Sequence, residues 1–224
     1  FLGIFSIAHR NWLFDFDIFF GHNWDFTFPE TSILAERVIN LSIYSYNDFV
    51  EHNPLLLSHA PHNFLYTSLA YILPPELISR LILFLCSLIS FLSMDLFLRS
   101  QSDKYISFVG GLLYAFSPFF FSIIISGSWY AWVSYSIAPL YLFFFVHYYR
   151  EGKVNNLIGL AASHLLLQGF IQYYILVLVF GILLVLIDRL YHPTHLKILI
   201  KRSILISITL IWVSLFWLIP FFND

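Results

Sequence analysis

Charged side chains are scarce in this sequence: they make up 11% of its 224 residues, against about 25% in a typical soluble domain. Hydrophobic residues account for 59% and aromatic residues for 21%. So few charges do not cover a water-facing surface, whereas lipid accepts apolar side chains on every face of a helix. The same figures exclude a disordered chain, which would be poor in aromatic and β-branched residues. The composition therefore predicts a polytopic membrane protein, and we expect it in the cell membrane.

Cysteine and excess positive charge are also missing. Cys86 is the single cysteine and lies in an apolar run, so the chain has no intramolecular disulfide framework. The net charge of -2 provides no basic surface for nucleic acid, and no nucleic-acid partner is expected. Membrane lipid is the partner that the composition indicates.

Long apolar runs fill the sequence from residue 77 onward. Runs of membrane-spanning length cover 77–98, 105–126, 130–149 and 203–221. A further stretch, 155–187, carries no Asp, Glu, Lys or Arg and has room for one tilted helix or two short ones. The number of crossings depends on this stretch.

Basic residues decide between these alternatives, because short loops rich in Lys and Arg face the cytoplasm. Three loops are basic. The first contains Arg99 and Lys104, the second Arg150 and Lys153, and the third Arg189, Lys197, Lys201 and Arg202. All three share one side only if 155–187 crosses twice. We place the outer turn at Gln168 and Gly169, because glycine relaxes the backbone where a helix must stop.

The fold class predicted is all-α: a polytopic transmembrane bundle of six helices over 77–222. Residues 1–8 are expected to be the tail of a truncated first transmembrane helix, and the chain a fragment of a longer protein. Residues 9–76 then form an extracytoplasmic loop, which contains eight acids and two bases. All six tryptophans fall on or near this side, as expected for interfacial indoles. The loop has an amphipathic pattern at 32–40, typical of a surface helix. It also has a short apolar stretch at 63–73, ended by Pro74 and Pro75.

Carboxylates in this outer loop are the first candidates for chemistry. Asp15 and Asp17 stand two residues apart, and Asp25 follows. Paired carboxylates can bind a divalent cation, Mg²⁺ or Mn²⁺, that holds a phosphate, or one can act as a general base toward a hydroxyl. The alternative is that these acids are solvated loop residues.

Histidines are the second group of candidates. His59 and His62 flank Ala60 and Pro61; Pro61 argues against a regular helical face, and no cysteine completes a zinc site. No residue is therefore predicted as a metal ligand, and interfacial histidines that contact a lipid phosphate fit the pattern better. Within the spans only His164 lies deep, and we interpret it as a packed polar residue. Asp95 and Arg99, four residues apart, are predicted to pair.

The order of several motifs resembles the GT-C superfamily of membrane glycosyltransferases. After the acidic, proline-containing loop come a surface helix, an apolar stretch that ends in Leu-Pro, and a helix with Arg80. Later motifs are Gly111-Leu112-Leu113-Tyr114-Ala115-Phe116-Ser117-Pro118, Ala138-Pro139-Leu140 and Phe216-Trp217-Leu218-Ile219-Pro220-Phe221. Together they look most like the amino-terminal part of the α-(1→3)-arabinofuranosyltransferase group.

This resemblance implies a polyprenyl-phosphate sugar donor, an acceptor glycan or lipid on the outer face, and an aspartate base in the first outer loop. Asp25 is the residue that matches best, with Asp17 second. The substrate contacts that we expect are Asp15, His22, Trp24, His59, His62, Trp129 and Tyr130. The family's acidic pattern before the proline is thinner here, with Phe28 where an acid is often found. Two other classes stay open: a lipid-linked glycan flippase or transporter, and a non-catalytic scaffold of the same fold.

Overall fold

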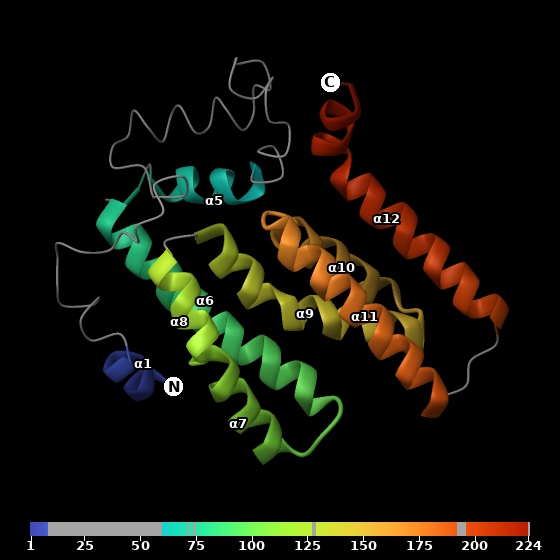
Figure 1. Cartoon of the computed structure of the whole chain (residues 1–224), viewed down its shortest axis with the longest axis horizontal. Coiled ribbons are helices and arrows are strands. Elements are labelled where there is room, and N and C mark those ends of the chain that lie inside the picture. The colour runs from blue at the N-terminus through green and yellow to red at the C-terminus, as the bar shows by residue number, and fades with distance from the viewer. Residues whose placement is uncertain (9–59, 71, 74, 127–128, 192–195, 224) are drawn as a thin grey trace.

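The computed structural model describes residues 1–8, 60–70, 72–73, 75–126, 129–191 and 196–223 (Figure 1). This part of the chain is helical and contains no strand, which confirms the predicted all-α class for these residues. In chain order the helices are α1 (Leu2–Ala8), α5 (Ala60–Ala70), α6 (Pro75–Arg99), α7 (Lys104–Ala115), α8 (Pro118–Ser126), α9 (Trp129–Glu151), α10 (Val154–Leu167), α11 (Ile171–Tyr191) and α12 (Leu196–Asn223).

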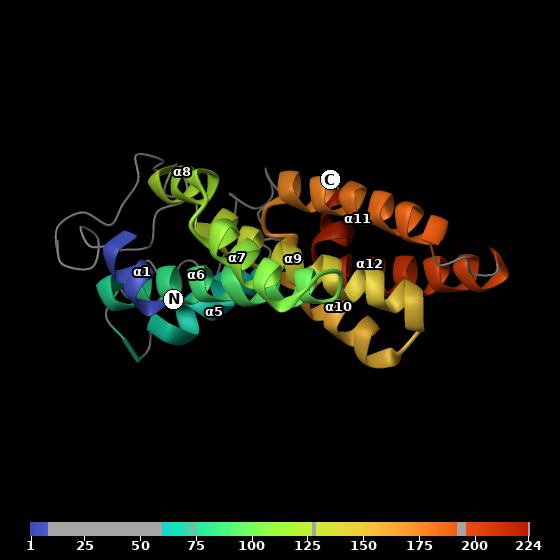
Figure 2. The same cartoon turned by 90° about the horizontal axis from the view of Figure 1, so that it is seen from below.

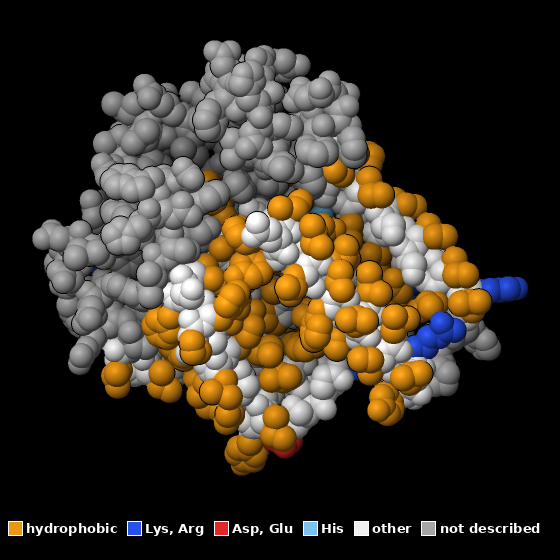
Figure 3. All heavy atoms as spheres, viewed as in Figure 1, with side chains coloured by type: hydrophobic (Ala, Val, Ile, Leu, Met, Phe, Trp, Pro, Cys, Tyr) orange, Lys and Arg blue, Asp and Glu red, His pale blue; other side chains and the backbone are white. Residues whose placement is uncertain are grey.

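Four segments of the described chain are long and apolar enough to cross a membrane. They are Arg80–Arg99 in α6, Lys104–Ile123 across α7 and α8, Ile171–Tyr191 in α11, and Leu196–Phe216 in α12. Large apolar side chains are exposed on α7, α11 and α12, and hydrophobic atoms cover most of the described surface in Figure 3. These properties are compatible with a multi-pass membrane protein, since lipid covers such faces without cost.

The other two predicted crossings are α9 and α10. The 14 residues of α10 span about 21 Å, less than the roughly 30 Å of a hydrocarbon core. Helix α9 lies at the centre of the bundle and contacts α6, α8, α10, α11 and α12. In Figure 2 it lies between α10 and α11. Six crossings therefore stay a prediction, as does the surface helix at 32–40, which lies outside the described residues.

Prolines and caps set several helix boundaries. Helix α6 begins at Pro75, as the proline pair predicts, because proline fits the first position of a helix. The predicted span 105–126 corresponds to the candidate span Lys104–Ile123, which is divided into α7 and α8 before Pro118. Ser117 caps the second piece, accepting a hydrogen bond from the Phe120 amide at 3.1 Å. Helix α12 begins seven residues before the predicted start at 203, since Lys197 and Lys201 belong to its first turns.

The chain reverses at Gln168 and Gly169, between α10 and α11. This break, predicted from the charge pattern, brings the basic loops to one end of the bundle. Arg150, near the end of α9, donates to Asp188 on α11 at 2.6 Å and to Gln101, just after α6, at 3.2 Å. Arg202, near the start of α12, donates to the Tyr149 carbonyl oxygen. We call this the basic end.

The opposite end of the bundle carries α5. In Figure 1 this helix lies crosswise over the ends of α9 and α10, and it contacts α6 and α10. We call this region the α5 end. Eight of the nine Lys and Arg residues of the described chain lie at the basic end, and Arg80, near the start of α6, is the exception. This is largely the charge partition expected for a membrane bundle.

Gly152 terminates α9 at the basic end. Its φ of 70° lies in the left-handed region, which glycine adopts without steric cost and which is common just after a helix. Its amide donates to the Tyr148 carbonyl oxygen at 2.8 Å. The guanidinium of Arg202 lies 2.7 Å from the position that a Cβ at Gly152 would take, so a larger residue would also displace the side chain that caps α9.

Candidate functional site at the α5 end

The structure describes three of the nine residues predicted for the site. Asp15, Asp17, His22, Trp24, Asp25 and His59 lie outside the described residues. His62 belongs to the first turn of α5, while Trp129 and Tyr130 begin α9. The structure brings two of these side chains, His62 and Tyr130, into direct contact.

His62 is fully buried, with none of its surface exposed. Its ring meets the Tyr130 ring edge to face, with centroids 5.6 Å apart and an interplanar angle of 83°. Pro61 was predicted to argue against a helical face shared by His59 and His62; His59 lies outside the described residues, and α5 begins after it, at Ala60. Proline is tolerated in the first turn, where the backbone amide has no intrahelical partner. The helix therefore begins before Pro61 and turns the histidine into the bundle.

Gly169 is the second contact of His62. A Cβ built on this glycine would lie 2.0 Å from His62 Cε1 and 2.4 Å from Nδ1. Gly152 is the one described glycine with a positive φ, so a left-handed backbone is not the reason for glycine at position 169. The reason is close approach: the turn between α10 and α11 leaves room for the imidazole of α5.

Gly169→Ala is therefore expected to push α5 away from the bundle and to destabilise the protein by about 1–3 kcal/mol, the usual cost of overpacking. Thermal unfolding of the purified protein in detergent measures this. Gly3→Ala is the matched control, because nothing lies within 4 Å of a Cβ at Gly3. Adding His62→Ala to Gly169→Ala should recover stability; a double variant whose loss equals the sum of the two single losses would contradict the contact.

A second polar group lies one turn below Gly169. His164 Nε2 shares a hydrogen bond of 2.8 Å with Ser214 Oγ of α12, and this hydroxyl donates to Gln168 Oε1 at 3.1 Å. All three residues are buried. Polar groups buried in a membrane bundle are stable only when paired, and this cluster joins α10 to α12.

Aromatic rings complete this cluster. The Tyr174 ring lies 5.0 Å from the His164 ring. Tyr141 is fully buried, and its hydroxyl has no hydrogen-bond partner within the described chain. The sequence identified His164 but missed Ser214, which is one of four hydroxyl-bearing residues in α12 and carries no signal that distinguishes it from the others.

The break between α7 and α8 is held by a reciprocal tyrosine pair. Tyr114 Oη donates to the Tyr135 carbonyl oxygen at 2.8 Å, and Tyr135 Oη donates to the Tyr114 carbonyl oxygen at 3.0 Å. The rings stack with centroids 4.2 Å apart. Each accepting carbonyl stands four residues before a proline, Pro118 or Pro139, which has no amide proton to give the usual helical bond. The tyrosines supply the donors that the prolines remove.

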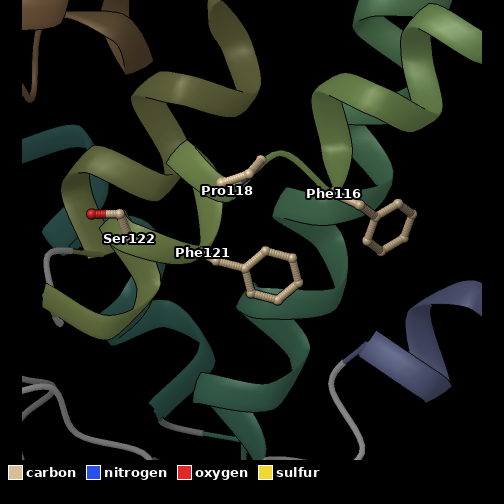
Figure 4. Close-up of a pocket in the computed structure, with 4 residues that line it drawn as sticks. All are labelled: Phe116, Pro118, Phe121 and Ser122. Carbon is tan, nitrogen blue, oxygen red and sulfur yellow. The ribbon is translucent and has the colours of Figure 1, made fainter.

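An open apolar pocket of about 500 Å³ lies beside this break, lined by Phe116, Pro118, Phe121 and Ser122. In Figure 4 the rings of Phe116 and Phe121 point to the same side of the break. The lining offers three apolar side chains and one hydroxyl, so the pocket suits a hydrocarbon rather than a charged group.

Metal ligands do not gather in the part of the chain that the structure describes: no group of three or more His, Cys, Asp or Glu residues forms there. The single cysteine, Cys86, is buried within α6 and reduced. Asp15 and Asp17, the paired carboxylates, lie outside this part of the chain.

Comparison with known proteins adds no further assignment. No protein-family model matches the chain, and neither the curated proteins nor the solved structures give a match.

Proposed function

We propose that this chain is part of an integral membrane glycosyltransferase of the GT-C type. The enzyme would move a sugar from a polyprenyl-phosphate donor to an acceptor glycan or lipid on the outer face of the membrane. The observation that carries the proposal is the contact of His62 with Tyr130 and Gly169, because it docks α5 onto the bundle end opposite the basic end. The acidic residues 9–59 directly precede α5 in the sequence, which is why the proposal assigns the chemistry to that end.

In the proposed reaction Asp25 is the general base. It takes the proton of an acceptor hydroxyl while the hydroxyl oxygen attacks the anomeric carbon of the donor sugar. The bond between this carbon and the phosphate oxygen breaks, and polyprenyl phosphate leaves with the bonding electrons. Tyr130 and the tryptophans at 24 and 129 offer aromatic faces for the sugar rings, as proposed from the sequence.

A lipid-linked glycan flippase is the second candidate, and the buried cluster around His164 favours it. Transport pathways use polar groups at membrane depth, and His164, Gln168 and Ser214 are such groups joined by hydrogen bonds. This function would need the cluster to open toward both ends of the bundle during the transport cycle.

One experiment separates the two candidates from a scaffold. Full-length protein in liposomes is given a polyprenyl-phosphate sugar with a radiolabelled sugar, together with a cell-envelope extract as the source of acceptor. The proposal expects label in the acceptor and release of free polyprenyl phosphate. Unaltered donor that crosses the bilayer would instead establish the flippase, and no effect on the donor would overturn both proposals.

A further inference from the structure

The basic end holds more bases than its acids neutralise. Its described residues include four acids, Asp95, Asp103, Glu151 and Asp188, against eight bases, Arg99, Lys104, Arg150, Lys153, Arg189, Lys197, Lys201 and Arg202. Each acid has a hydrogen-bonding partner, so the excess positive charge lies on the bases that no acid contacts.

Three acids pair with bases near α6 and α9. Asp95 Oδ2 accepts from Arg99 at 2.6 Å, as the spacing predicted, and Asp188 from Arg150 at the same distance. Glu151 lies 2.9 Å from Lys153 Nζ, and the hydrogen bond from this lysine, followed by that from His147, lowers the pKa of the Glu151 carboxyl. The fourth acid, Asp103, caps α7 by accepting from the amides of Tyr105 and Ile106.

Five bases are left over: Lys104 begins α7, and Arg189, Lys197, Lys201 and Arg202 gather where α11 ends and α12 begins. Arg189, Lys197 and Lys201 have no acidic partner among the described residues. Lys197 and Lys201 are exposed and four residues apart, on one face of α12. Four residues separate the two helices, so their ends lie at most about 18 Å apart. Charge of one sign is therefore concentrated in a small area.

Exposed apolar side chains surround these bases. Leu190 and Tyr191 are 81% and 77% exposed at the end of α11, and Leu196 and Ile200 are 58% and 50% exposed at the start of α12. Figure 3 shows Lys and Arg side chains next to hydrophobic atoms at this edge of the molecule. A surface that offers cationic groups beside a bare apolar face is complementary to an anionic headgroup and its acyl chains.

We propose that the end of α11 and the start of α12 bind an anionic phospholipid of the bilayer. Arg189, Lys197 and Lys201 bind its phosphate, and its acyl chains cover Leu190, Leu196 and Ile200. The choice of lipid over a soluble anion follows from these apolar neighbours, which a free phosphate would leave uncovered. The site does not depend on the proposed sugar transfer, because it lies at the other end of the bundle.

The test measures lipid retained by the purified full-length protein in detergent, by native mass spectrometry. Phosphatidylglycerol and phosphatidylcholine with identical acyl chains are added in turn. We expect a preference for phosphatidylglycerol that falls by roughly 25-fold in K197Q/K201Q, since each of the two bases near a membrane surface contributes about fivefold. K153Q is the control, because Glu151 already neutralises Lys153.

Three further results decide the proposal. Inorganic phosphate at the same concentration should fail to displace the lipid; displacement would assign the site to a soluble anion and overturn the proposal. Equal retention of both lipids by the unmodified protein would also overturn it. An equal loss of phosphatidylglycerol in K153Q and in K197Q/K201Q would replace a defined site with general attraction by the basic end.

Discussion

Asp25→Asn in the full-length protein is expected to lower the rate of sugar transfer by on the order of 10²–10⁴-fold, the usual contribution of a general base. The amide has nearly the same shape as the carboxylate but cannot take the proton of the acceptor hydroxyl. Donor binding should change little, so the loss is expected in kcat rather than in KM. Initial rates with labelled polyprenyl-phosphate sugar measure both constants.

Asp48→Asn is the matched control for this prediction. It removes one acid from the same stretch of sequence, so the two variant proteins have the same net charge. We expect nearly unchanged transfer. Transfer by Asp25→Asn at the unmodified rate would exclude Asp25 as the base, and Asp17→Asn would then be the next variant to measure.

The second large effect is expected at the tyrosine pair between α7 and α9. Tyr114→Phe with Tyr135→Phe leaves the two carbonyl oxygens that accept their hydroxyls without these donors. The Tyr114 carbonyl oxygen keeps the Ser117 amide as a donor at 3.4 Å. The loss is therefore expected mainly at the Tyr135 carbonyl oxygen, where a buried polar group without its partner costs about 1–3 kcal/mol. Thermal unfolding in detergent measures the loss, with Tyr191→Phe on the exposed surface of α11 as the control.

Pro139 offers a sharper test of the same idea. Pro139→Ala restores a backbone amide that can donate to the Tyr135 carbonyl oxygen within α9. Tyr114→Phe should then cost less in the Pro139→Ala background than in the unmodified protein. Equal costs in the two backgrounds would mean that the tyrosine does not replace the donor that the proline lacks.

Local features of the fold were predictable because they depend on neighbours in the sequence. The proline pair gave the start of α6, the four-residue spacing gave the pair of Asp95 and Arg99, and the distribution of bases gave the turn after α10. The first two follow from rules that act within one helix, and the third from counting charges along the chain; none needs to know which helices touch. Pro118 also indicated the break between α7 and α8, but the apolar run 105–126 predicts one span.

Contacts between distant segments were not predictable. His62 and Gly169 are more than a hundred residues apart, and Ser214 is 50 residues from His164. Hydropathy gives the length of each helix but not which face it turns to which neighbour, because lipid and protein accept the same apolar side chains. The reciprocal bonds of Tyr114 and Tyr135 likewise require α7 and α9 to meet at these residues. The sequence around each tyrosine does not reveal that contact.

The central claim is that the α5 end faces the outside of the cell and the basic end faces the cytoplasm. Single cysteines test it directly in a Cys86→Ser background: Ser68→Cys on the exposed surface of α5, and Lys153→Cys between α9 and α10. A membrane-impermeant maleimide applied to intact cells should label position 68, and position 153 only after the membrane is opened. Labelling of position 153 in intact cells, with position 68 protected, would contradict the account.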